Sequence, residues 1–130
     1  MILLDTHIWI RWLSAPEGLP AAVLAQIEAA DALAISAISC WELGQLVRRQ
    51  RLTLDRGVSE WIDAATAEVV QVMPVDRQIA ELASALPEHH RDPADRLIIA
   101  TAIRERIELL SLDRVFPLYQ PEGLLLRPIE

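Results

Sequence analysis

Four carboxylates stand where predicted strands end or predicted helices begin, and together they could hold a metal ion. These acids are Asp5, Glu42, Asp95 and Asp113. In a parallel sheet, the carboxyl ends of strands and the amino ends of the following helices lie along one edge, so these side chains can converge. Clustered carboxylates repel one another, and hard oxygen donors without a Cys or His ligand pattern select Mg²⁺ or Mn²⁺ rather than zinc. Such ions bind phosphate oxygens and can activate water for attack on a phosphodiester.

Each of these acids also has a purely structural interpretation. Asp5 follows the apolar run of residues 2–4 and could simply begin a helix. Glu42 lies early in its predicted helix, where the helix dipole favours an acid. Asp113 follows a predicted strand and could cap a turn. Their joint placement therefore carries more weight than any one of them.

Asp95 is the most informative acid. It lies at the third position of a helix whose following residues are nearly all apolar, so we expect it to be partly buried. A buried carboxylate is costly unless it is paired or binds a metal, and Arg91 or Arg96 could be its partner. Asp92 also lies nearby, but its place before Pro93 fits a helix N-cap better than a ligand.

The elements that position these acids follow from apolar periodicity. Short, mostly apolar runs predict strands over residues 2–4, 33–35, 69–73 and 109–111, with a fifth strand at an edge over 124–126. Helical spacing predicts helices over residues 6–13, 20–30, 40–50, 55–68, 75–86 and onward from Pro93. This alternation predicts a three-layer α/β fold, with helices on both faces of a parallel sheet of four to five short strands. Residues 1–130 are enough for one domain with a single core.

Local signals add detail to two of these helices. Ser39, followed three residues later by Glu42, has the form of a capping box. Asp55 is the predicted cap of the helix over residues 55–68. The helix over residues 40–50 is expected to turn one apolar set inward, namely Trp41, Leu43, Leu46 and Val47.

Composition limits the chemistry and the compartment. The net charge of −7 usually argues against nucleic-acid binding, although a metal site needs local acids that count toward it. All twelve basic residues are Arg, which excludes a P-loop ATPase, a pyridoxal Schiff base and a lysine nucleophile. The apolar runs are shorter than the roughly 18 residues of a membrane span, and Asp5 interrupts the first run before it could serve as a signal peptide. We expect a cytoplasmic protein, and the lone Cys40 fits a reducing compartment.

Four segments, taken in order, resemble PIN-domain ribonucleases, and most closely the toxins of VapBC-type bacterial toxin–antitoxin modules. They read ILLDTHIW, SAISCWELGQL, HRDPADRLIIATA and LLSLDRVF, and the resemblance covers nearly the whole chain. It implies that Asp5, Glu42, Asp95 and Asp113 are the metal-binding, catalytic acids. It also implies that the hydroxyl groups of Thr6 and Ser111 support the site. The family often has Thr at the position of Ser111.

The same resemblance implies the ligands and partners. The metal is Mg²⁺ or Mn²⁺, the substrate is RNA, and a small antitoxin covers the site with its C-terminal segment. A homodimer and a toxin–antitoxin hetero-oligomer are the expected assemblies.

Several further residues are candidates for contacts with these partners. Basic side chains around the predicted site could bind RNA phosphates: Arg48, Arg49, Arg51, His90 and Arg91. Trp9 and Trp12 are candidates for the apolar part of an antitoxin interface. His7 adjoins Asp5, but a first-turn histidine is more often exposed or hydrogen-bonded than a ligand. Tryptophans at helical spacing are more typical of a core or a protein interface than of base stacking.

Three alternative functions can be weighed from the residues. A phosphoacceptor receiver-like domain needs a Lys near its acids, and the chain has none. A haloacid-dehalogenase-type phosphatase needs a second Asp two residues after the first, where this chain has His7. A PIN-like fold that only binds RNA or protein, without catalysis, stays open, and metal-dependent cleavage would separate it from a nuclease.

Overall fold

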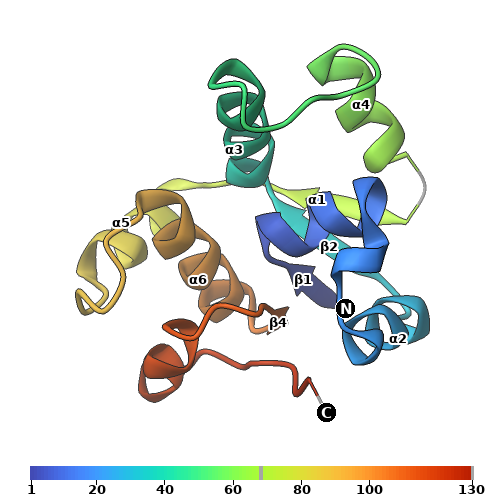
Figure 1. Ribbon diagram of the computed structural model, residues 1–130. Coiled ribbons are helices and arrows are strands. Elements are labelled where there is room, and N and C mark those ends of the chain that lie inside the picture. Colours follow the sequence, from blue (N-terminus) through green and yellow to red (C-terminus); the bar gives the residue numbers. More distant parts are fainter. Residues whose placement is uncertain (68, 130) are drawn as a thin grey trace.

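Four short parallel strands form the central sheet of the computed structural model, which describes residues 1–67 and 69–129 (Figure 1). They lie in the spatial order β3-β2-β1-β4, each parallel to its neighbour. Their bounds are β1 Ile2–Leu4, β2 Leu33–Ser36, β3 Val70–Met73 and β4 Glu108–Leu110. Every residue of β1 and β2 is buried, as expected for central strands covered on both faces. The predicted parallel sheet is confirmed.

Helices connect the strands and cover the sheet. The α-helices are α1 Thr6–Ser14, α2 Ala21–Ala29, α3 Ala37–Arg48, α4 Val58–Ala65, α5 Arg77–Ala85 and α6 Pro93–Glu105. Two 3₁₀ helices, η1 Pro16–Gly18 and η2 Phe116–Glu122, complete the connections. In Figure 1, α5 and α6 lie to one side of the strands, and α1 and α2 to the other.

Alternating side chains of β1 divide the core into two layers. Ile2 and Leu4 pack into a cluster with the buried faces of α1, α2 and α4. Leu3 packs into a second cluster with α5, α6 and η2. Because successive strand residues point to opposite faces, one short strand anchors both layers. The predicted three-layer α/β architecture is confirmed.

Two predicted helix starts are wrong. The cap of α3 is Ser36, whose side chain accepts a hydrogen bond from the Ile38 N–H at 3.2 Å, so Ser39 and Glu42 lie inside the helix and form no capping box. The cap of α4 is Gly57 rather than Asp55. Asp55 instead pairs with the neighbouring Arg56 at 3.2 Å. The predicted helix over residues 55–68 ends at residue 65, and Glu68 lies outside the described residues.

Residues 124–126, which were predicted to form a fifth strand, form a single β-bridge instead. Leu126 pairs with Leu109 of β4 at the edge of the sheet, in parallel. The Leu109 N–H donates to the Leu125 carbonyl at 2.8 Å, and the Arg127 N–H donates to the Leu109 carbonyl at 2.9 Å. The tail therefore satisfies one residue of the edge strand without extending into a strand of its own.

Trp41 is also placed differently from its prediction. Leu43 of the same helix is fully buried, but the Trp41 side chain is 56% exposed. Ser39 and Leu43, four residues apart, form the buried face of α3, and Trp41, two residues from each, lies on the opposite face. Among the residues described, no helix is long and apolar enough to cross a membrane.

Candidate active site

Asp5 lies directly after β1, at the carboxyl edge of the sheet. Its carboxylate accepts a hydrogen bond from the Ser111 hydroxyl at 2.7 Å and another from the His7 backbone N–H at 3.2 Å. The second bond makes Asp5 the N-cap of α1, so its structural interpretation also holds. Burial raises the pKa of Asp5, and the bond from Ser111 opposes that shift. Two hydrogen bonds therefore fix the orientation of a buried acid at this edge.

Asp95 reaches the same edge from the first turn of α6. Asp92 begins this helix as predicted, accepting hydrogen bonds from the N–H groups of Ala94 and Asp95 at 2.9 and 3.4 Å. The Asp95 side chain is buried, and burial is the main reason that its pKa rises to about 7. The negative charges of Asp5, Asp92 and, more weakly, Glu42 add to this rise. Their effect on one carboxyl places these acids in a shared electrostatic environment.

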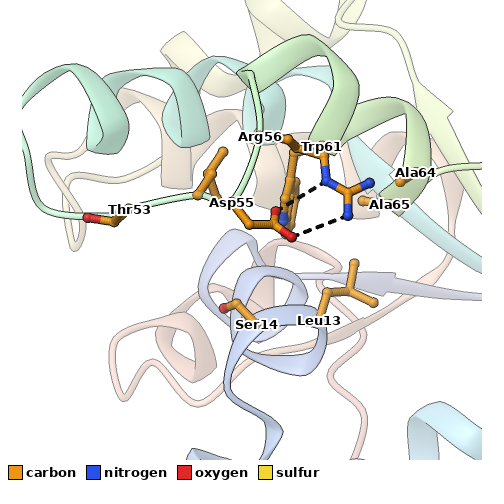
Figure 2. Close-up of a pocket in the computed structure, with 9 residues that line it drawn as sticks. Leu13, Ser14, Thr53, Asp55, Arg56, Trp61, Ala64 and Ala65 are labelled. Carbon is orange, nitrogen blue, oxygen red and sulfur yellow. Dashed lines mark hydrogen bonds and ion pairs between the residues drawn. The ribbon is translucent and has the colours of Figure 1, made fainter.

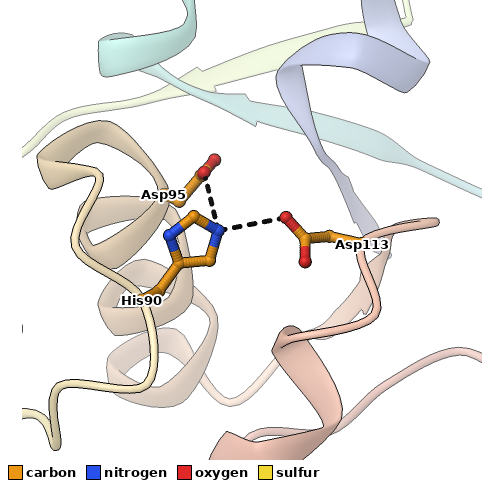
Figure 3. A group of neighbouring side chains, drawn as sticks. All are labelled: His90, Asp95 and Asp113. Carbon is orange, nitrogen blue, oxygen red and sulfur yellow. Dashed lines mark hydrogen bonds and ion pairs between the residues drawn. The ribbon is translucent and has the colours of Figure 1, made fainter.

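Asp113 approaches from the segment after β4, and His90 lies between it and Asp95 (Figure 3). The His90 Nε2 atom is 3.0 Å from Asp95 Oδ2 and 3.0 Å from Asp113 Oδ2. The other oxygen of Asp113 accepts the Val115 N–H at 2.8 Å, so this acid caps a turn as well. One ligand atom from each of these three side chains lies within 4.8 Å of the others.

Glu42 joins the site from α3 through hydroxyl groups. The Thr6 hydroxyl donates to Glu42 Oε1 and lies 2.7 Å from the Ser39 hydroxyl. Burial raises the pKa of Glu42, and the Thr6 bond opposes the shift. Thr6 and Ser111 each therefore support one acid, Glu42 and Asp5 respectively.

These donors suit a hard divalent cation. Among the described residues, no arginine pairs with Asp5 or Asp95, and neither Arg91 nor Arg96 is the partner of Asp95. Two buried carboxylates without a permanent positive charge fit the oxygen-rich environment that Mg²⁺ and Mn²⁺ prefer. The imidazole of His90 is the one nitrogen donor in the three-residue group.

Arg96 has a structural function that the sequence did not suggest. Its guanidinium donates to four backbone carbonyls at 2.7 to 3.1 Å, those of Ala83, Leu86, Pro87 and His90. Tyr119 closes the same loop, since its hydroxyl donates to the Pro87 carbonyl and accepts the His90 N–H, both at 2.7 Å. Together Arg96 and Tyr119 fix the backbone that carries His90. The sequence feature that could have indicated this function is the presence of an arginine within a mostly apolar helix.

The predicted partner residues divide by exposure. Arg48, Arg49, Arg51 and Arg91 are exposed, so phosphate contacts remain open to them. Trp9 is fully buried and packs edge-to-face on Trp61, which makes it a core residue and not part of an interface surface. Trp12 is partly buried against the same cluster, and its predicted contact stays a prediction.

A cleft lies between α1 and α4, and none of the four candidate metal-binding acids lines it (Figure 2). Leu13 and Ser14 of α1 form one side, and Thr53, Asp55 and Arg56 form another. Leu13 is 40% exposed there, which makes it an accessible apolar side chain on α1.

Solved structures confirm the fold. VapC20 of Mycobacterium tuberculosis, described as a sarcin–ricin loop cleaving toxin, matches with a TM-score of 0.70 and 19% identity over 98% of this chain and 100% of that one. VapBC2 of Rickettsia felis, solved with a DNA fragment from its promoter, matches with a TM-score of 0.70 and 17% identity over 98% of each chain.

Sequence comparison identifies the family. The model of the PIN domain matches residues 2–120. Ribonuclease VapC22 of Mycobacterium tuberculosis is 40% identical over 114 residues, which cover 87% of each chain. This chain belongs to the PIN-domain family and is a homologue of the VapC ribonucleases.

Proposed function

We propose that this protein is a metal-dependent endoribonuclease and the toxin of a type II toxin–antitoxin system. The observation that carries the proposal is the pair of buried acids, Asp5 and Asp95, at the carboxyl edge of the sheet without an arginine partner among the described residues. Glu42 and Asp113 approach the same edge. The identity of 40% to a protein named as a ribonuclease supports RNA as the substrate.

The metal is Mg²⁺ or Mn²⁺, held by Asp5, Glu42, Asp95 and Asp113. When bound, such an ion would supply an activated water and neutralise charge on the attacked phosphate. Ser111 orients Asp5, and Thr6 orients Glu42, so that the carboxylate oxygens keep fixed positions. The His90 imidazole lies between Asp95 and Asp113, with Nε2 3.0 Å from an oxygen of each.

The partner is a small cognate antitoxin. Structures with similar folds include toxin–antitoxin complexes, such as VapBC2 of Rickettsia felis. An inserted Arg or Lys from the antitoxin would neutralise the acids, and Leu13 offers an apolar contact on α1. We further propose that residues 1–130 form one domain, that the protein assembles as a homodimer and as a hetero-oligomer with the antitoxin, and that it acts in the cytoplasm.

The test is cleavage with mapping of the product ends. Purified protein is incubated with a pool of structured RNAs in Mg²⁺, in Mn²⁺ and in EDTA. Hydrolysis by water leaves a 5′-phosphate and a 3′-hydroxyl, and EDTA should stop it. Products ending in 2′,3′-cyclic phosphates would contradict the metal mechanism. Metal-independent RNA binding without any cleavage would instead support a binding module.

A further inference from the structure

Trp41 of α3 is exposed beside the acids, in contrast to Trp9 of α1 and Trp61 of α4. Its side chain is 56% exposed, whereas Trp9 and Trp61 are at most 9% exposed. Trp41 directly precedes Glu42, so the indole begins next to a proposed metal ligand. The indole is therefore accessible to a ligand bound beside the acids.

A cleft of about 400 Å³ connects this tryptophan to the acids. It lies between α3 and the start of α6, and Trp41, Glu42 and Pro93 are among its lining residues. His7, whose backbone N–H holds Asp5, lines it too. The cleft therefore adjoins the acid site at Glu42 and His7.

Two arginines line the same cleft beside two acids, Glu42 and Asp92. Arg49 and Arg51, which follow the end of α3, line it and are exposed. Arg48 lies one residue earlier, is exposed as well, and does not line the cleft. In a chain with a net charge of −7, two arginines in a groove beside an acid site provide a local surface for a polyanion.

We infer that this cleft binds the single-stranded segment of RNA next to the cleaved phosphodiester, with Trp41 stacking on a base and Arg49 and Arg51 holding phosphates. The inference rests on the proposed function and names how that site takes its substrate. An aromatic platform together with a positive groove is the common arrangement for single strands, because every base has a stacking face. Paired bases leave no face free for Trp41, so the cleft selects unpaired RNA.

Binding by Trp41 is tested with an unpaired eight-nucleotide RNA in an Asp95→Asn background, which prevents cleavage. Trp41→Leu should weaken binding about tenfold, and Trp41→Tyr, which keeps an aromatic face, should stay within about threefold of the parent. Leu118→Ala, a matched control on the equally exposed Leu118 of η2, should leave Kd unchanged. A duplex of the same sequence should bind weakly to every variant. Equal Kd values for Trp41→Leu and its parent would overturn the inference.

The arginines are tested by the salt dependence of the same binding. Arg49→Ala and Arg51→Ala should each lower the slope of log K against log salt by about 0.7, the value for one phosphate on a single strand. Arg77→Ala, on the exposed surface of α5, should leave the slope unchanged. Unchanged slopes for both Arg49→Ala and Arg51→Ala would remove the arginines from the inference.

Two outcomes separate this inference from the proposed function. If the wild-type protein cleaves RNA and Trp41→Leu has the same KM, the proposed function stands and the cleft inference fails. If the wild type binds unpaired RNA through Trp41 but never cleaves it, the cleft inference stands and the nuclease fails. A Trp41→Leu variant that changes the oligomeric state but not the Kd for RNA would identify Trp41 as a protein contact and overturn the inference.

Discussion

Asp95 and Arg96 are neighbours in the first turns of α6, and their charged groups have opposite surroundings. The Arg96 guanidinium donates to four backbone carbonyls. The Asp95 carboxyl is buried among other acids, and its contact with a basic group is His90 at 3.0 Å. The protein itself accepts the hydrogen bonds of the Arg96 guanidinium, whereas the Asp95 carboxyl has no arginine partner among the described residues.

This difference distinguishes a charged group that stabilises the fold from one that is available to bind a ligand. A charge that only stabilises the fold is paired by the chain itself, because an unpaired buried charge is costly. Burying Asp95 beside other acids, without an arginine partner among the described residues, costs stability, and such a cost persists at sites that bind a ligand. Substitutions at the two positions should therefore change different properties of the protein.

The largest expected effect is on catalysis. Asp95→Asn should lower RNA cleavage on the order of a thousandfold, because it removes a metal-binding oxygen charge while keeping the shape of the side chain. Asp92→Asn is the matched control, since Asn caps a helix as well as Asp does, and it should keep most of the activity. The measurement is initial cleavage rate in Mn²⁺. Comparable losses in both variants would mean that the start of α6, and not the Asp95 carboxylate, was disturbed.

The second largest effect is expected on stability, from a substitution at Arg96. Arg96→Met should lower the free energy of unfolding by about 3 kcal/mol, because the four carbonyls lose a charged donor. Urea denaturation measures this change. Arg104→Met, on the exposed side of α6, where the guanidinium bonds Gln78, provides the control. A difference below about 0.5 kcal/mol between the two variants would show that water replaces these bonds without cost.

A smaller effect is expected where a hydroxyl orients an acid. Ser111→Ala should lower kcat/KM about tenfold, because Asp5 loses the bond that fixes its carboxylate. Ser111→Thr keeps the hydroxyl and should keep the rate. Should both variants lose activity alike, the effect would come from packing after β4 and not from the hydrogen bond.

The sequence predicted those parts of the fold that local signals determine. The run of residues 2–4 and the Asp92-Pro93 start of α6 are examples, since each signal lies within the element itself. The start of α3 was missed because Ser36 and Ser39 can both cap a helix, and the length of β2 decides between them. The exposure of Trp41 was missed because an apolar residue was assumed to face the core, although it lies two residues from the buried Leu43.

The site was predicted as a set of acids but not as a set of contacts. Parallel topology alone brings Asp5, Asp95 and Asp113 to one edge, so their convergence could be argued from the order of elements. The position of His90 depends on a loop held by Arg96 and Tyr119, which is 23 residues from Arg96 along the chain. No local pattern in the sequence encodes such a contact.

The smallest effect is the pH dependence of the metal-free protein. Burial raises the pKa of Asp95 from 3.8 to about 7, so the folded state holds a proton that the unfolded chain releases. This contribution to stability is complete below the unfolded value and is lost as the pH rises through about 7. Between pH 5 and pH 8, the free energy of unfolding of the wild type should therefore fall more than that of Asp95→Asn in urea denaturation. Parallel pH profiles for the two proteins would contradict the assignment.

We propose that the buried Asp95 carboxylate, which has no arginine partner among the described residues, binds a divalent cation. Thermal unfolding at pH 8, with and without Mn²⁺, tests it most directly. The wild type should gain about 4 °C or more in Tm from saturating Mn²⁺, and EDTA should reverse the gain, because the ion binds only the folded state. Asp95→Asn should melt at or above the metal-free wild type and gain little. A wild type that gains nothing, together with an Asp95→Asn variant that melts lower, would contradict the claim.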